Sequence, residues 1–266
     1  MRDLGVAALL AVAFLALLAA SGRLRFLQDE MPSWARRCAA LLLLWAVLLS
    51  CVFYPSVSPG DAADVDPATV WFPSIFLGQL ILAAFLFLWW RLAGPVRLRH
   101  FLRLENVSFD DVVFGLRIGA VGWALAITAS ALVALALLVA GYKPSGEGSA
   151  AQPFEVPALL LWLTDLPVWR KLIVVSVAMT IEEGFYRAFL QTRVGWTLSS
   201  VLFALSHGGY GLPTLTVSVF AVSLAIGWAL QRRGNLLPCI VAHGMFDAVQ
   251  LLVIMPIAIQ HLRDVT

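Results

Sequence analysis

Eight apolar runs, each long and poor in charged residues, follow one another along the chain of 266 residues. A helix that crosses about 30 Å of hydrocarbon needs about 20 such residues, and fewer where protein surrounds it. Because a bilayer offers no water to backbone N–H and C=O groups, such runs fold as helices. We therefore predict an all-α polytopic membrane protein with about eight transmembrane helices in one bundle. The expected helices are residues 4–21, 39–55, 70–90, 112–141, 171–192, 194–207, 213–230 and 236–259.

The composition argues against a soluble domain and against a nucleic-acid partner. Hydrophobic residues make up 61% of the chain and charged residues 13%, which is too apolar for a soluble domain of this length. The net charge of +2 comes from arginines in short loops, and these form no face that follows a nucleic-acid backbone. Cys38, Cys51 and Cys239 show no Cys-x-x-Cys spacing, so they indicate neither a disulfide framework nor a thiolate metal site.

The loop charges orient the predicted bundle. Connections 22–38, 91–111 and 231–235 carry arginines, whereas 56–69 has only acidic charges. The positive-inside bias places the arginine-rich connections in the cytoplasm and both termini outside. Arg170 and Lys171 would then lie on the outer side, against this bias. The arginine loops either only fix the topology or also bind anionic headgroups of membrane lipids.

The first run has a second interpretation. It follows Arg2 and ends in Ala19-Ala20-Ser21, as a cleaved signal peptide does. The arginine-rich connection 22–38 follows at once and would resist translocation, which favours a retained first span.

One flexible, polar stretch divides the chain. Residues 144–149 read Pro-Ser-Gly-Glu-Gly-Ser, and nearly all ionisable groups within apolar runs follow them. We expect N-terminal helices over 1–141, a polar loop with a short interfacial segment over 142–170, and a further set of helices, which holds these ionisable groups, over 171–259. Within the loop, residues 157–169 are apolar but short, and they suit a surface or re-entrant piece better than a span.

Two adjacent carboxylates and an arginine lie in the middle of run 171–192. Charges at mid-bilayer cost several kcal/mol, roughly 2.5–3.5 on insertion scales. Glu183 and Arg187 can pair through an i,i+4 contact, whereas Glu182 is turned about 100° away. Glu182 is therefore the carboxylate that is free to take a proton from water. The alternative is a buried Glu-Arg pair that only fixes helix packing.

Two histidines add polar groups at a similar depth. His207 ends run 194–207, where a lone histidine is usually a cap or an interfacial residue. His243 and Asp247 share one face of the last run. Such a pair is typical of a metal half-site, a proton relay, a set of oxyanion donors or a hydrogen bond that joins two helices. Gly244 beside them lets another helix or a substrate backbone come close. At 1.5 Å per residue, these groups and Glu182 fall about 10–20 Å from the arginine-marked side.

Three polar motifs thus follow in order: Glu182-Glu183 with Arg187, Phe203 with His207, and His243 with Asp247. This order resembles the CPBP family, which comprises CAAX prenyl endopeptidases, bacteriocin-processing and bacteriocin-immunity proteins, and "abortive infection" membrane proteins. The resemblance covers about residues 171–259. Ala188 stands where the first motif often has Gly, and Asp247 stands where Asn is commoner, which weakens an amide-like donor role at 247.

The resemblance implies an intramembrane endopeptidase of the prokaryotic plasma (inner) membrane, with its polar layer nearer the cytoplasmic side. Its substrate would be a peptide or a lipidated protein. Glu182 with His207 would activate a water, His243 and Asp247 would stabilise the oxyanion, and Glu183 with Arg187 would hold the first motif in place.

The chemistry and its rivals stay open at this point. Glu182, His207 and His243 would also make a three-ligand site for a divalent metal such as zinc, or no metal is used. A non-enzymatic immunity or scaffold protein, with a polar layer that only locks helices, is the main alternative. A proton-coupled transporter is a third reading, but no matching pair of broken helices is present.

Overall fold

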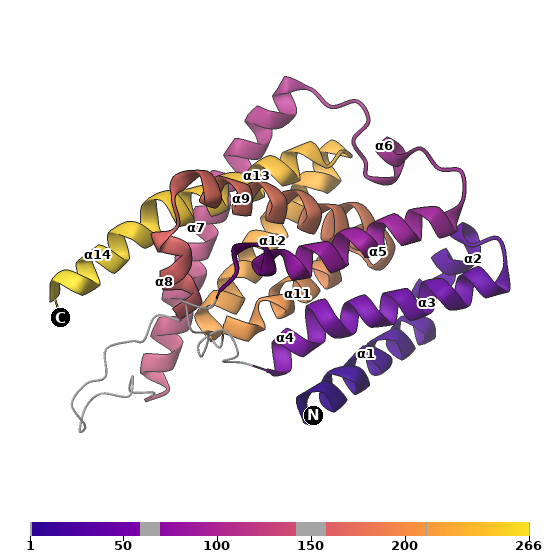
Figure 1. The fold of residues 1–266 in the computed structure, drawn as a ribbon, viewed down its shortest axis with the longest axis horizontal. Helices are drawn as coiled ribbons and strands as arrows, with labels where there is room; N and C mark the ends of the chain where they lie inside the picture. Colours follow the sequence, from indigo (N-terminus) through magenta and orange to yellow (C-terminus); the bar gives the residue numbers. More distant parts are fainter. Residues whose placement is uncertain (1, 59–69, 142–157, 211, 266) are drawn as a thin grey trace.

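The computed structural model describes residues 2–58, 70–141, 158–210 and 212–265, and over these residues the protein is helical without a strand (Figure 1). The long helices and their continuations are α1 Arg2–Ala20, α3 Trp34–Leu48, α4 Tyr54–Val57, α5 Leu77–Ala93, α7 Phe109–Val139, α9 Val168–Glu183, α11 Trp196–Ser206, α12 Pro213–Arg233, α13 Leu237–Val249 and α14 Met255–Val265. Short helices are α2 Phe26–Glu30, α6 Leu98–Phe101, α8 Ala158–Asp165 and α10 Thr192–Val194, with 3-10 turns at Arg23–Arg25, Phe72–Phe76 and Gly208–Tyr210. Segments Leu49–Phe53, Gly184–Gln191 and Gln250–Ile254 are π-helical.

All eight predicted runs are helical, which confirms the all-α membrane fold. Six helical stretches of the described chain are long and apolar enough to cross a membrane: Arg2–Ala20, Trp34–Val57, Phe72–Ala93, Phe109–Val139, Thr214–Arg233 and Leu237–His261. The two other predicted runs are 171–192, which holds the charged motif, and 194–207, which yields a helix of 11 residues. The protein is therefore an integral membrane protein, whereas the number of eight spans stays a prediction. The polar stretch 144–149 lies outside the described residues. The described part of the apolar segment 157–169 forms the short helix α8 and the first two residues of α9.

The arginine-rich connections gather at one end of the bundle. A cavity of about 770 Å³ is lined from all three of them, among others by Arg23, Arg103 and Gly234. Arg103 also accepts a 2.8 Å backbone hydrogen bond from Leu236 N. The predicted grouping of these loops on one side agrees with this arrangement. None of the residues predicted for the active site lines this cavity.

Aromatic side chains lie at the opposite end. The Arg170 guanidinium lies 5.0 Å from the ring centroid of Phe72 and 5.1 Å from that of Trp169, and Lys171 is buried. Aromatic rings gather where a bilayer meets water, and they attract cations over their faces. The loop-charge bias would not place these two cations on this side. Arg170 has aromatic partners there, and Lys171 is packed among neighbouring side chains.

Small residues bring α7 and α13 into close contact. A Cβ atom added at Gly115 would lie 2.7 Å from the carbonyl oxygen of Pro238, and one at Gly119 would lie 2.8 Å from Met245 Sδ. Glycines four residues apart make one smooth helix face, against which a second backbone can pack. This packing fixes the position of α13, which carries the third polar motif.

Gly244 also lets a neighbouring helix come close to α13, on a different side from α7. A Cβ atom there would lie 2.1 Å from Met179 Sδ of α9. The sequence predicted that Gly244 would let a helix or a substrate come close, and the neighbour is a helix. Helix α9, with the first motif at its end, therefore packs directly on α13.

The first motif continues into a π-helical segment. All eight residues of Gly184–Gln191 are buried, and Phe185 and Phe189 make edge contacts with Phe85 of α5. Single π-helical turns inside α-helices occur often at functional sites. Here the segment anchors the first motif in the core formed with α1, α3 and α5.

Candidate active site

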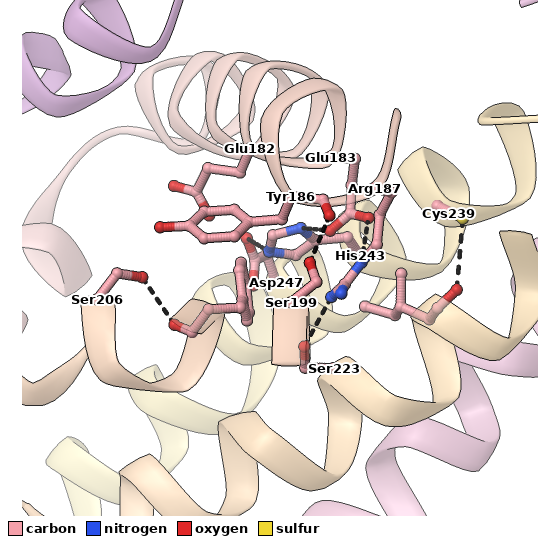
Figure 2. Close-up of polar contacts among 12 residues, drawn as sticks. Glu182, Glu183, Tyr186, Arg187, Ser199, Ser206, Ser223, Cys239, His243 and Asp247 are labelled. Atoms are coloured by element: carbon pink, nitrogen blue, oxygen red, sulfur yellow. Dashed lines mark hydrogen bonds and ion pairs between the residues drawn. The ribbon is translucent and has the colours of Figure 1, made fainter. Parts of the chain in front are cut away.

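Glu183 lies at the centre of the polar side chains. Its Oε2 accepts a hydrogen bond from Arg187 Nε at 3.1 Å, and its Oε1 lies 2.9 Å from His243 Nδ1 (Figure 2). The Glu183 and Arg187 side chains are both fully buried. The predicted i,i+4 pair is therefore formed. The structure adds that the same carboxylate joins the first motif to the third.

Arg187 is held from three directions. Its Nη2 donates to Ser223 Oγ of α12 at 2.7 Å, and its guanidinium lies 5.3 Å from the Phe203 ring centroid of α11. A buried guanidinium needs several acceptors or a π-face to offset its desolvation. Ser223 was not predicted, and the only signal for it was a hydroxyl inside an apolar run.

His243 is placed between two carboxylates. Nδ1 faces Glu183, and Nε2 lies 3.3 Å from Asp247 Oδ2. Carboxylates only accept hydrogen bonds, so both contacts are satisfied when both ring nitrogens carry a proton. A ring with a proton on both nitrogens would carry a positive charge, which would offset, together with Arg187, the charges of Glu183 and Asp247.

Glu182 faces a different side of the helix from Glu183, as predicted (Figure 2). It is half-buried, and its Oε1 accepts a 2.9 Å hydrogen bond from Gln79 Nε2 of α5. His243, His207 and Asp247 all act on it electrostatically. The four groups of the predicted polar layer are therefore near enough to interact, and among the described residues no cation bonds directly to Glu182.

His207 is oriented by its own helix. Nδ1 lies 2.9 Å from the Phe203 carbonyl oxygen and 3.2 Å from Ser206 Oγ. Because a carbonyl only accepts, Nδ1 carries the proton in this arrangement. A ring with its proton on Nδ1 alone keeps a lone pair on Nε2, which can accept a hydrogen bond from water.

A zinc site on Glu182, His207 and His243 does not fit this arrangement. Within residues 2–58, 70–141, 158–210 and 212–265, no three His, Cys, Asp or Glu side chains form a group suited to a metal ion. A metal-bound imidazole offers one nitrogen lone pair, whereas both nitrogens of His243 face carboxylates. The hypothesis of a metalloprotease is therefore not supported by the side-chain arrangement.

The comparison with protein families fits these three motifs. Residues 164–249 match the family model described as "Type II CAAX prenyl endopeptidase Rce1-like". The chain carries an Rce1-like region. This confirms the resemblance predicted from the sequence, and the family points to a hydrolase, a CAAX-type intramembrane protease. Searches of curated proteins and of solved structures found no match.

The Rce1-like region contains all six residues predicted for the site, but not all of their partners. Gln79, which bonds to Glu182, lies in α5 far outside the matched residues. Gln79 was not predicted, because an amide carries no charge and does not stand out among the ionisable groups of the apolar runs. An isolated amide in an otherwise apolar helix was the available signal.

Proposed function

We propose that this protein is an intramembrane endopeptidase, which hydrolyses a peptide bond of a membrane-associated or lipidated peptide. The proposal rests on one observation, which is that two adjacent carboxylates have different surroundings. A half-buried carboxylate, Glu182, lies next to a fully buried charge network around Glu183. A polar network that only held helices together would not need the half-buried carboxylate of Glu182.

Glu182 and His207 activate the water. One oxygen of Glu182 is bound by Gln79, and the other has no hydrogen bond from the described residues, so it is available to a water molecule. The Nε2 lone pair of His207 accepts a second hydrogen bond from the same water. Glu182 removes a proton, and the hydroxide oxygen attacks the scissile carbonyl carbon.

His243 and Asp247 stabilise the oxyanion that forms. The 3.3 Å contact between Nε2 of His243 and Asp247 is long for a charge-assisted hydrogen bond, so this N–H can be shared with the developing oxyanion. Asp247 keeps the ring in place, and Glu183 with Arg187 holds its other side. When the tetrahedral intermediate collapses, the C–N bond breaks and Glu182 returns its proton to the leaving amine.

The expected setting is the prokaryotic plasma membrane. Counted at 1.5 Å per residue, Glu182 lies about 21 Å from the start of α9. It lies less than about 16 Å from Arg193 at the arginine-rich end, because most of the residues between them are π-helical and rise less per residue. With that end in the cytoplasm, cleavage occurs in the cytoplasmic half of the bilayer, on a tail that enters from lipid or the interface. We expect residues 1–141 to form supporting helices and 171–259 to carry the catalytic groups.

Replacing Glu182 by Gln tests the function. Detergent-purified wild type is expected to cleave members of a fluorogenic peptide library with lipid tails, and the Glu182→Gln variant, with unchanged thermal unfolding, is expected to cleave none. Glu105→Gln, at an exposed carboxylate, is the matched control and should cleave like wild type. Cleavage retained in Glu182→Gln would remove the assignment and favour a non-enzymatic immunity or scaffold protein.

A further inference from the structure

Gln79 is an unusual residue for its helix. It lies near the start of α5, and from Leu77 to Trp90 it is the only residue with an amide, a hydroxyl or a charge. Burying an amide among apolar side chains is unfavourable unless its hydrogen bonds are made. The amide of Gln79 therefore needs a hydrogen-bond partner from another part of the chain.

That partner is Glu182. Gln79 Nε2 donates to Glu182 Oε1 at 2.9 Å, and the Oε1 atom of Gln79 is buried without a hydrogen-bond partner among the described residues. The orientation of the amide follows from the chemistry, since a carboxylate accepts and only the NH₂ end can donate. The amide is only partly satisfied, so packing alone is a poor account of it.

The contact fixes one oxygen of Glu182 and leaves the other available. A carboxylate on a long side chain has several rotamers, and a single donor from a neighbouring helix selects one. Among the described residues, no hydrogen bond from the first motif reaches Glu182, since Arg187 donates to Glu183 and Ser223 instead. A general base must lie within hydrogen-bond distance of its water, and small displacements reduce the rate strongly.

We propose that Gln79 is a positioning residue, which holds Glu182 so that its second oxygen faces the attacking water. This inference rests on the proposed function. It assigns α5, from the N-terminal part of the chain, a direct part in a site whose six predicted residues all lie in the Rce1-like region. Gln79 acts through Glu182 and touches neither the substrate nor the reacting atoms.

A second glutamine offers a matched control. Gln191 is buried, its Nε2 donates to the Gly227 carbonyl oxygen at 2.8 Å, and its Oε1 also lacks a partner. Gln79→Met and Gln191→Met thus remove the same groups at similar volume, but only the first removes a hydrogen bond to a carboxylate. We expect Gln79→Met to lower kcat about tenfold to hundredfold with KM nearly unchanged, and Gln191→Met to keep the wild-type kcat.

The experiment measures kcat, KM and thermal unfolding of wild type, both glutamine variants and Glu182→Gln on one lipid-tailed peptide. A double-mutant cycle of Gln79→Met with Glu182→Met on the unfolding midpoint tests the contact without substrate, because each change removes one partner of the hydrogen bond, and non-additive shifts are expected. Wild-type kcat in Gln79→Met, or equal losses in both Met variants that follow their unfolding midpoints, would overturn the positioning role while Glu182→Gln stays inactive. If wild type cleaves no peptide, the proposed function fails, and the positioning role fails with it.

Discussion

Two adjacent glutamates of the first motif lie in contrasting surroundings. Glu183 is fully buried and bonded to Arg187 and His243. Glu182 is half-buried, and within the part of the chain that the structure describes it is bonded only to the amide of Gln79. We call Glu183, Arg187, His243 and Ser223 the closed group, and Glu182 with His207 the open group. The first makes its bonds within the protein, and the second keeps acceptor atoms available for a water molecule.

The difference shows how one short motif can serve both structure and chemistry. Buried ion pairs are strongly destabilised when one partner is removed, because the other charge is left uncompensated. They are suited to fixing the places of helices α9, α11, α12 and α13. A reactive carboxylate must instead remain incompletely satisfied, and its neighbours must be rigid. The closed group supplies that rigidity beside the open group.

The largest expected effect is on the closed group. Glu183→Gln leaves the Arg187 and His243 charges without their shared partner, so we expect the free energy of unfolding to fall by about 3–5 kcal/mol. Denaturant unfolding in detergent measures it. Glu182→Gln is the matched change one residue earlier, and it should alter stability by less than about 1 kcal/mol because its contact is a single hydrogen bond. Equal losses in the two variants would abolish the distinction between the groups.

The open group should behave in the opposite way. His207→Ala removes the Nε2 acceptor, and we expect kcat/KM to fall by about 100-fold. Its unfolding midpoint should change little, because Nδ1 bonds only within its own helix end. Activity on the peptide of the Glu182 assay and thermal unfolding together test this. A large loss of stability would assign His207 to the closed group.

The sequence allowed the helices and the contacts within single helices to be predicted. Runs of apolar residues gave the helices, and i,i+4 spacing gave the Glu183–Arg187 and His243–Asp247 contacts. Counting residues from the arginine loops predicted a common depth for the motifs. Each of these follows from helix geometry within one segment.

Contacts between helices were not accessible in this way. The hydrogen bond from Gln79 to Glu182 joins residues 103 positions apart, and the contact of His243 with Glu183 joins residues 60 apart. Which faces meet depends on helix rotation and on close packing at Gly115 and Gly119. The π-helical turn Gly184–Gln191 also shifts the face of every residue after it, and apolar periodicity does not reveal such a turn.

A smaller effect should follow from the hydroxyl of the closed group. Ser223→Ala leaves a buried N–H of Arg187 without an acceptor, and we expect a loss of about 1–3 kcal/mol in unfolding free energy. Ser218→Ala, on the same helix, is the control, because its hydroxyl contacts uncharged groups, the Thr214 and Ala126 carbonyl oxygens and the Ser130 hydroxyl, and its loss leaves no charged group unpaired. Ser223→Ala should therefore be the more destabilising change, and the reverse order would remove Ser223 from the closed group.

The smallest effect is expected at Gly244, which lies between α9 with the first motif and α13 with the third. An added methyl group there meets the flexible end of Met179, whereas at Gly115 it meets the Pro238 backbone carbonyl. Replacing a helical Gly by Ala also gains about 1 kcal/mol of helix propensity, which offsets the movement of Met179. Gly244→Ala should therefore leave the unfolding free energy almost unchanged, while Gly115→Ala should lower it, since a backbone atom cannot move aside and overpacking costs about 1–3 kcal/mol. If Gly244→Ala lowers the unfolding free energy more than Gly115→Ala does, the α9–α13 contact is at least as rigid as the α7–α13 contact. The closed group would then depend directly on the α9–α13 spacing, which brings Glu183 to His243.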